Sequence, residues 1–277
     1  MFDLSGKVAF ITGGARGQGR SHAVTLAKAG ADVAVSDICG ALGVCYPDAS
    51  FEDLEETKLL VEKEGRKCLI ARVDVRDPAA LTAFANRAVN DLGSLDILAA
   101  NAGILEFAAF SDLTSAQWQK MVDINLTGVF NSMKAVLPHM LAAGKGRIVA
   151  TSSMAGRMGY GNIAHYTAAK WGVIGLVKDV AVELGQSGVT VNAICPTNVG
   201  TPMVLNPFTY QMFRPELTNP GPDDITDVMS APHPQAVPWI EPQDVSAALL
   251  YLASDEARHV TGEVMTVSAG LSARNST

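Results

Sequence analysis

Seven short runs of mostly apolar residues recur along the chain and are separated by longer segments. They cover residues 7–12, 31–37, 67–74, 95–103, 146–153, 189–196 and 264–270. The runs are apolar nearly throughout instead of alternating between apolar and polar positions, as strands covered on both faces require. The pattern therefore predicts seven buried strands.

The segments between these runs have the spacing of amphipathic helices. In residues 243–253, apolar side chains fall at positions i, i+3, i+4 and i+7 beginning with Val245, and residues 20–29 also carry one apolar face. Repeated strand–helix–strand order is typical of a doubly wound α/β protein. We expect residues 1–277 to form one Rossmann-like domain, in which helices cover both faces of a parallel sheet of about seven strands.

Two segments interrupt this rhythm. Residues 38–51, called the insert below, are longer than a usual strand-to-helix loop. Residues 202–242, called the cover segment below, contain nine prolines and few periodic signals. The cover segment also carries large apolar side chains, among them Met203, Leu205, Phe208, Tyr210, Met212, Phe213, Met229 and Trp239. It could pack on the core as a surface excursion, but its place after the carboxyl end of a strand favours a lid over an apolar ligand.

Composition narrows the possible functions. Hydrophobic residues make up 48% of the 277 residues, which excludes disorder for most of the chain. The net charge is −7 without a run of Lys or Arg, so we expect no binding to nucleic acid or to an anionic membrane face.

No apolar stretch could span a bilayer, and the N-terminus lacks a secretory pattern, so a reduced, cytoplasmic protein is expected. Cys39 and Cys45 have no histidine nearby, and no metal site is expected.

A glycine-rich segment follows the first predicted strand. Gly13, Gly17 and Gly19 have the spacing G-x3-G-x-G, which is neither GxGxxG nor a P-loop. Glycines permit a tight turn and a close approach of the backbone to a diphosphate, and the following helix offers free N–H groups. Together with Arg16 and Gln18, these glycines form the predicted diphosphate site of a dinucleotide.

An acidic residue ends the second predicted strand. Asp37 lies 18 residues after Gly19, where a carboxylate can accept hydrogen bonds from both hydroxyls of an adenosine ribose. It would repel a 2′-phosphate, which favours NAD over NADP, although the cation of Arg16 could still meet a phosphate. Ile38 follows Asp37 and belongs to the same predicted site.

A second acidic residue ends the third predicted strand. Asp74 could bind the adenine amino group, with Val75 beside it, or it could cap the helix that begins after Pro78. The sequence leaves these two interpretations equally open.

A tyrosine and a lysine share one face of a predicted helix. Tyr166 and Lys170 are at positions i and i+4. A free tyrosine has a pKa of about 10, and a nearby ammonium group lowers the pKa of a phenol toward the working range of a base. Ser153, at the end of the fifth strand, could hydrogen-bond a substrate oxygen.

These motifs occur together and in order. The chain resembles the short-chain dehydrogenase/reductases over essentially its whole length. The residues that carry the resemblance are Gly13, Gly17, Gly19, Asn101, Ala102, Gly103, Asn125, Ser153, Tyr166, Lys170 and Pro196.

The resemblance implies a role for each catalytic candidate. It assigns Tyr166 as general acid/base, Ser153 as partner of the substrate oxygen, and Lys170 as activator of the tyrosine and ligand of the nicotinamide ribose. It assigns Asn125 to a water that links Lys170 to solvent. Ser152 is the neighbouring alternative to Ser153, but the offset of 13 residues from Tyr166 favours Ser153.

The resemblance also extends the predicted cofactor site. Tyr166 and Lys170 count among its residues, and six further positions are Asn101, Ala102, Gly103, Pro196, Val199 and Thr201. The family's usual Pro-Gly is Pro196-Thr197 here, so the local backbone path could differ.

A subgroup resemblance lies in the glycine segment and the insert. Both are similar to the actinobacterial carveol-dehydrogenase-like enzymes, which are grouped as mycofactocin-coupled. We hypothesise that the insert folds over bound NAD and slows its exchange, so that a redox partner would re-oxidise the bound NADH. A surface loop used for subunit contact is the alternative.

The predicted activity is reversible, NAD-dependent oxidation of an apolar, cyclic or terpenoid secondary alcohol to its ketone. An NADPH-dependent 3-oxoacyl reductase and a non-catalytic NAD-binding regulator are the alternatives. The resemblance also implies a homotetramer, in which the long helices after the fourth and fifth strands pack across subunits.

Overall fold

The seven predicted strands form one sheet. The structure, a computed structural model, describes residues 2–274. All strand pairs in the sheet are parallel, and the order is β3-β2-β1-β4-β5-β6-β7. The strands are β1 Val8–Thr12, β2 Asp32–Asp37, β3 Cys68–Arg72, β4 Ile97–Ala100, β5 Gly146–Thr151, β6 Val189–Pro196 and β7 Val264–Val267. The doubly wound α/β architecture predicted from the sequence is confirmed.

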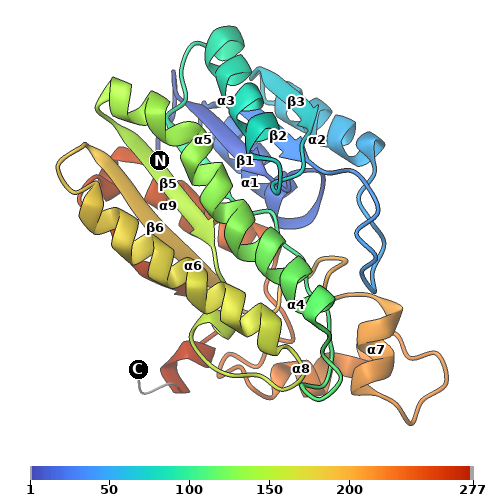
Figure 1. Cartoon of the computed structure of the whole chain (residues 1–277). Coiled ribbons are helices and arrows are strands. Elements are labelled where there is room, and N and C mark those ends of the chain that lie inside the picture. Colours follow the sequence, from blue (N-terminus) through green and yellow to red (C-terminus); the bar gives the residue numbers. More distant parts are fainter. Residues whose placement is uncertain (1, 275–277) are drawn as a thin grey trace.

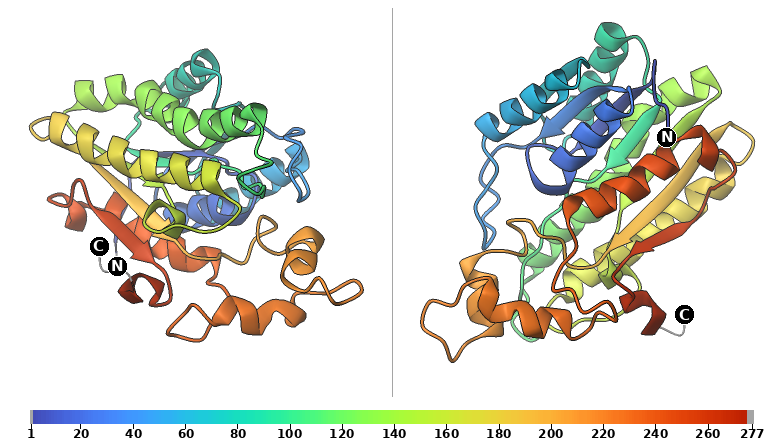
Figure 2. Two further views of the ribbon diagram at one scale, coloured as in Figure 1. Left: turned by 60° about the horizontal axis from the view of Figure 1, so that its bottom comes forward. Right: turned by 180° about the vertical axis from the view of Figure 1, so that it is seen from behind.

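Helices cover the sheet on both faces. One face carries α3, α5 and α6, and the other carries α1, α2 and α9 (Figures 1 and 2). The helices are α1 Gly17–Lys28, α2 Phe51–Lys63, α3 Pro78–Leu92, α4 Ser115–Val122, α5 Gly128–Ala143, α6 Ala164–Glu183, α7 Pro207–Phe213, α8 Thr226–Ser230 and α9 Pro242–Ala253. None of these helices is both long enough and apolar enough to cross a membrane, within the part of the chain described.

Two layers of core explain why the strands are apolar throughout. Phe10, Leu98 and Ile148 point into the core beneath α3, α5 and α6. Ile11 and Ile97, from the same strands, point into the core beneath α1 and α9. Successive residues of a strand face opposite sides, so a strand covered by helices on both faces needs apolar residues at every position.

Local capping signals set where several helices begin. Ser50 caps α2, and its hydroxyl accepts the N–H of Asp53 in a capping box. Asp77 caps α3 by accepting the N–H groups of Ala79 and Ala80, each at 3.0 Å. The interpretation of Asp74 as the cap of this helix is therefore wrong. Asp77, directly before Pro78, is closer to the N–H groups of the first turn and accepts their hydrogen bonds.

Several predicted strands end earlier than their apolar runs. β3 ends at Arg72, β4 at Ala100 and β5 at Thr151. Because parallel strands have their carboxyl ends at one edge of the sheet, the residues that follow them gather along that edge. Figure 1 shows the cover segment around α7 and α8, and the insert as the blue loop that descends between β2 and α2; both lie at this edge.

The cover segment contains helices that its sequence pattern does not reveal. It holds α7, α8 and a 3₁₀ turn at Asp223–Ile225. Asn206 caps α7 by accepting the N–H of Thr209 at 3.0 Å, and Pro207 occupies its first position. These helices are too short for an apolar periodicity to be visible in the sequence.

Candidate active site

Two cavities adjoin at the carboxyl edge of the sheet. The smaller has a volume of about 160 Å³ and the larger about 550 Å³. They share the lining residues Gln18, Asn101, Gly103, Thr201 and Met203. Every residue predicted for catalysis or cofactor binding lines one cavity or the other.

The smaller cavity begins at the glycine-rich turn. α1 starts at Gly17, three residues earlier than its apolar pattern indicates, so the end of this turn forms the first turn of the helix. Among the described residues no side chain caps that turn, and Gly17, Gln18 and Gly19 line the cavity. Free N–H groups at the positive end of a helix favour an anion such as a diphosphate.

Gly13 has no room for a side chain. Its φ is +67°, and a Cβ would lie 2.7 Å from the Cα of Ala102. Asn101 holds the same turn, since its Nδ2 donates to the carbonyl oxygens of Thr12 and Gly13 at 3.2 and 3.1 Å. The segment 101–103 is thus bound directly against the glycine-rich turn.

Asp37 connects the end of β2 to that turn. One carboxylate oxygen accepts the N–H of Ala15 at 3.0 Å, and the other accepts the N–H of Cys39 at 3.1 Å. The side chain is buried but lines the smaller cavity, next to Ile38. Its remaining lone pairs can accept hydrogen bonds from a ligand hydroxyl in the cavity.

Asp74 and Val75 also line the smaller cavity. Asp74 forms an ion pair with Arg76, with Oδ2 at 2.5 Å from Nη2. Desolvation of Asp74 opposes the hydrogen bonds from Arg76, and the net result is a pKa below the usual value. Asp74 is therefore held as a carboxylate at the cavity wall, which is compatible with an adenine amino group.

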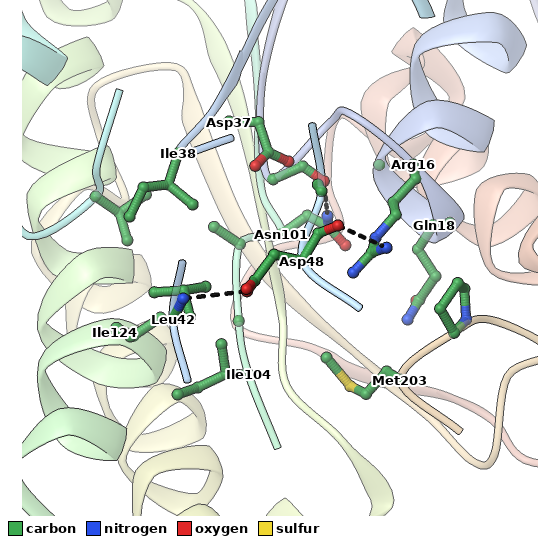
Figure 3. Close-up of a pocket in the computed structure, with 18 of the residues that line it drawn as sticks. Arg16, Gln18, Asp37, Ile38, Leu42, Asp48, Asn101, Ile104, Ile124 and Met203 are labelled. Atoms are coloured by element: carbon green, nitrogen blue, oxygen red, sulfur yellow. Dashed lines mark hydrogen bonds between the residues drawn. The ribbon is translucent and has the colours of Figure 1, made fainter. Parts of the chain in front are cut away.

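Arg16 points toward the insert. Its guanidinium group donates to the carbonyl oxygens of Pro47 and Asp48. Asp48 in turn accepts the N–H of Leu42 at 3.1 Å, so that Asp48 lies between Leu42 and Arg16 in the cavity (Figure 3). These contacts join the glycine-rich turn to the insert, and Arg16 also lines the smaller cavity as predicted.

The insert reaches the opposite side of the cavity. The hydroxyl of Tyr46 accepts the N–H of Leu105, beyond β4, at 3.3 Å. Lys120 of α4 donates to the carbonyl oxygen of Gly43 at 3.3 Å and pairs with Glu106 at 2.9 Å. Together with the contacts of Arg16 on the near side, these contacts hold the insert on two sides of the smaller cavity.

The three catalytic candidates meet in the larger cavity. Ser153, Tyr166 and Lys170 all line it. The Nζ of Lys170 lies 5.6 Å from the centre of the Tyr166 ring and donates to the carbonyl oxygen of Thr151 at 2.8 Å. The arrangement can exchange a proton with a substrate oxygen through the phenol and orient that oxygen through the serine.

Burial controls the ionisation of this pair. It raises the pKa of Tyr166 to about 12, and the hydrogen bond with the Ser153 hydroxyl opposes that rise. Burial also lowers the pKa of Lys170 to about 8. The shift of Tyr166 is opposite to the lowering predicted from the sequence, because the loss of water around the phenol outweighs the stabilisation of its charge.

The two adjacent serines have different partners. The hydroxyl of Ser152 donates to the carbonyl oxygen of Lys170 at 2.8 Å and is buried. The hydroxyl of Ser153 hydrogen-bonds Tyr166 and accepts the N–H of Ala155 at 3.1 Å. Ser152 therefore holds the helix that carries Lys170, whereas Ser153 is the serine beside the phenol.

Asn125 lies in a π-helical turn at Asp123–Thr127, between α4 and α5. Its side chain is buried, with Oδ1 accepting the N–H of Ile104 at 3.1 Å and Nδ2 donating to the carbonyl oxygen of Met121 at 3.2 Å. Such wide turns often occur at functional sites. Asn125 also lines the larger cavity, close to Gly103 and Lys170.

The rest of the larger cavity is mostly apolar. Phe107 packs against Phe208 of α7, with ring centres 5.9 Å apart, so the cover segment closes against the loop after β4. Met203, Met212, Phe213 and Met229 of the cover segment line the cavity as well. Sequence reasoning missed the lining residues Val73, Ile104, Leu105, Phe107, Ile124, Met154 and Tyr160. No sequence motif marks these residues. The only sequence signal for most of them is that they follow the carboxyl end of a predicted strand, where a ligand is expected.

Comparisons with known proteins agree with this geometry. Residues 7–209 match the family described as short chain dehydrogenase. The (-)-trans-carveol dehydrogenase of Rhodococcus erythropolis is 46% identical over 273 residues, which cover 98% of this chain and 99% of the relative.

Two solved structures are similar over nearly the whole chain. A carveol dehydrogenase from Mycobacterium avium in complex with NAD has a TM-score of 0.97 and 49% identity, covering 99% of this chain and 100% of that one. A short chain dehydrogenase from Mycobacterium paratuberculosis bound to NAD has a TM-score of 0.89 and 38% identity, covering 98% and 99%.

Proposed function

This chain belongs to the short-chain dehydrogenase family of NAD-dependent oxidoreductases, and we propose that it interconverts an apolar, cyclic secondary alcohol and its ketone. The predictions of family, carveol-dehydrogenase-like subgroup and NAD cofactor are confirmed. The observation that supports the reaction is the position of Ser153, Tyr166 and Lys170 in a cavity that adjoins the dinucleotide site.

The residues of the smaller cavity fit NAD. The free N–H groups of the α1 N-terminus suit the diphosphate, and the carboxylate of Asp37 suits the ribose hydroxyls. The Oε1 atom of Gln18 is buried and, within residues 2–274, has no hydrogen-bond partner. Since Gln18 lines both cavities, an amide or hydroxyl donor of the dinucleotide would satisfy that oxygen.

NAD supplies the acceptor of a hydride from the carbinol carbon. Tyr166 takes the hydroxyl proton during oxidation and returns a proton to the ketone oxygen during reduction. Ser153 donates a hydrogen bond that orients this oxygen toward the phenol. Lys170, when charged, stabilises the phenolate and would hold the nicotinamide ribose, and Asn125 would hold a water that connects Lys170 to solvent.

The wall of the larger cavity supports the proposed substrate class. Its volume of about 550 Å³ suits a compact apolar molecule together with part of the cofactor. The methionines and aromatic rings of the cover segment favour a ring-containing alcohol of terpenoid type. The carveol dehydrogenase of R. erythropolis, by its name, acts on such an alcohol.

The insert supports tight retention of NAD. Ile38, Leu42, Tyr46 and Asp48 line the smaller cavity, and Lys120 fastens the insert to its far side. Dissociation of the dinucleotide would require these contacts to open. A redox partner, which the subgroup resemblance links to mycofactocin, would then re-oxidise NADH in place.

Exposed apolar side chains support a homotetramer. Trp118 of α4, Phe130 of α5 and Trp171 of α6 are 41%, 45% and 50% exposed. These helices follow the fourth and fifth strands, where subunit packing is expected. We infer an oligomer assembled through this surface in the cytoplasm.

The two alternatives have weaker support. An NADPH-dependent 3-oxoacyl reductase would need to place a 2′-phosphate near the carboxylate of Asp37, which would repel it. A non-catalytic regulator would have no use for Ser153, Tyr166 and Lys170 in one cavity.

Oxidation of carveol with NAD tests the proposal. Because retained NAD would hide turnover in a release assay, the absorbance of reduced nicotinamide is followed in a single turnover. Tyr166→Phe should abolish this signal and leave NAD binding intact, whereas Tyr160→Phe in the same cavity should retain it. Near-normal rates in Tyr166→Phe would remove Tyr166 from its role. No signal from wild type with carveol or other cyclic secondary alcohols would reject the substrate class.

A further inference from the structure

A buried histidine of the cover segment contacts the end of β6. His233 is 3% exposed. Its Nδ1 lies 2.6 Å from the carbonyl oxygen of Val237, and its Nε2 lies 2.7 Å from the Oγ1 of Thr197. A carbonyl oxygen only accepts hydrogen bonds, so Nδ1 carries the proton. In the neutral ring Nε2 is then the acceptor, and the hydroxyl of Thr197 donates to it.

This bond decides what Thr197 presents to the substrate cavity. Thr197 follows Pro196, where the family resemblance leads us to expect glycine, and it lines the larger cavity. His233 is not among the described residues that line that cavity. The hydroxyl of Thr197 is thus paired with a side chain that lies outside the described lining of the cavity.

An unpaired hydroxyl at this position would be unfavourable. Thr197 is partly buried, so its hydroxyl without a partner would lose part of its hydration, and in an apolar cavity it would also hydrogen-bond the substrate. His233 removes both problems because its Nε2 accepts the one hydrogen that the Thr197 hydroxyl can donate.

The same part of the cover segment is held by backbone contacts. The N–H of Gln235 donates to the carbonyl oxygen of Ala269 at 3.1 Å. Pro234 lies against Gly270, where a Cβ would be 3.0 Å from the proline ring. Met229 and Pro232, just before His233, line the cavity. His233 therefore sits where the cover segment is fixed to the ends of β6 and β7.

We propose that His233 is a positioning residue for substrate specificity. It holds the hydroxyl of Thr197 out of the cavity and so keeps the wall apolar on the cover-segment side. This inference rests on the proposed function, since it concerns the binding of an apolar alcohol.

A rescue experiment tests this role. His233→Phe leaves the hydroxyl of Thr197 without its partner. The KM for carveol should then rise about fivefold to tenfold, which corresponds to the free energy of about one hydrogen bond. The kcat should change less than about twofold. Adding Thr197→Val removes the hydroxyl and should return KM to within about twofold of wild type. Thr197→Ser keeps the bond and should resemble wild type in KM.

A merely structural role predicts a different pattern. If His233 only stabilised the fold, the double variant would have a KM as high as that of His233→Phe, or higher. That result, or an unchanged KM in His233→Phe, would overturn the proposal. Ser246→Ala is the matched control, because it removes another buried hydroxyl–imidazole contact, Ser246 to His22 at 2.8 Å, away from the cavities. It should lower the unfolding temperature and leave KM unchanged.

A binding readout separates this proposal from the proposed function. Carvone, the ketone of carveol, should raise the unfolding temperature of the NAD-loaded wild type. The increase should be smaller for His233→Phe and should return to the wild-type increase for the double variant. If carvone stabilises wild type but carveol is not oxidised, the proposed reaction is wrong. The unfolding temperatures of the three proteins with carvone still test the role of His233. Equal stabilisation of all three proteins would reject the role of His233.

Discussion

Gly103 and Asn125 approach each other so closely that Gly103 has no room for a side chain. A Cβ at Gly103 would lie 2.6 Å from the Oδ1 of Asn125 and 3.5 Å from the Nζ of Lys170. The same Asn125 oxygen accepts the N–H of Ile104. The missing side chain thus lets the segment after β4, the amide of Asn125 and the Nζ of Lys170 approach one another beside the two cavities.

Gly103→Ala should therefore impair catalysis more than stability. The added methyl must displace Asn125 or Lys170, and a displacement of about 1 Å can cost about 100-fold in rate. We expect kcat to fall by about that factor, measured as the single-turnover rate. Gly159→Ala is the control, since a Cβ there would meet nothing within 4 Å. Equal rates in the two variants would contradict the role given to this contact.

The two directions of the reaction should respond differently to pH. Burial raises the pKa of Tyr166 to about 12, so its phenol is protonated at neutral pH. In the proposed reaction, reduction needs the protonated phenol, whereas oxidation needs the phenolate. The kcat/KM for oxidation should rise with pH, by up to about tenfold per pH unit below the pKa of Lys170, which burial lowers to about 8. Above that value Lys170 loses its charge, and the rise should flatten.

Initial rates in both directions between about pH 6 and pH 10 measure this difference. Reduction should change little between pH 6 and pH 8. A rate of oxidation that falls as the pH increases across this range would contradict the assignment of the phenol as the base.

The contact between Lys120 and the insert should limit the exchange of NAD. Lys120→Met removes the hydrogen bond to Gly43 and the ion pair with Glu106. Both groups are partly exposed, so we expect a loss of only about 1 kcal/mol and an exchange rate about fivefold faster. Exchange is measured by chasing bound, labelled NAD with unlabelled NAD.

Lys134→Met provides the comparison for this experiment. Lys134 is an exposed residue of α5 outside the insert contacts, and its substitution should leave the exchange rate unchanged. If wild-type protein loses all of its NAD on gel filtration, the insert does not retain the cofactor.

His22 should make the fold sensitive to acid. It is a buried residue of α1 that contacts Ser246 of α9, and burial lowers its pKa from about 6.5 to about 3. Between these pH values the unfolded chain binds a proton that the folded protein does not, so stability is complete above pH 6.5 and is lost as the pH falls toward 3. The shift corresponds to up to about 5 kcal/mol.

His22→Asn should remove this part of the acid sensitivity. The free energy of unfolding of the variant, measured by denaturant titration at several pH values, should fall less than that of wild type between about pH 6.5 and pH 4. His259→Asn changes an exposed histidine and should follow the wild-type curve. Parallel curves for His22→Asn and wild type would show that His22 does not titrate as described.

Local patterns were sufficient to predict the scaffold of the site. Continuous apolar runs indicated strands covered on both faces, and the glycine spacing indicated the turn before α1. The i,i+4 spacing of Tyr166 and Lys170 placed both on one side of α6. Each of these features depends on residues close in sequence or on a requirement that every buried strand must meet.

Other features depended on contacts between distant segments. The crossing of the insert to Lys120, the partner of Thr197 and the different contacts of Ser152 and Ser153 all join residues that only the folded chain brings together. The pKa of Tyr166 is the clearest case. The sequence predicted a lowering from the charge of Lys170, but the solvation of a phenol depends on every segment packed around it, and no local pattern records that burial.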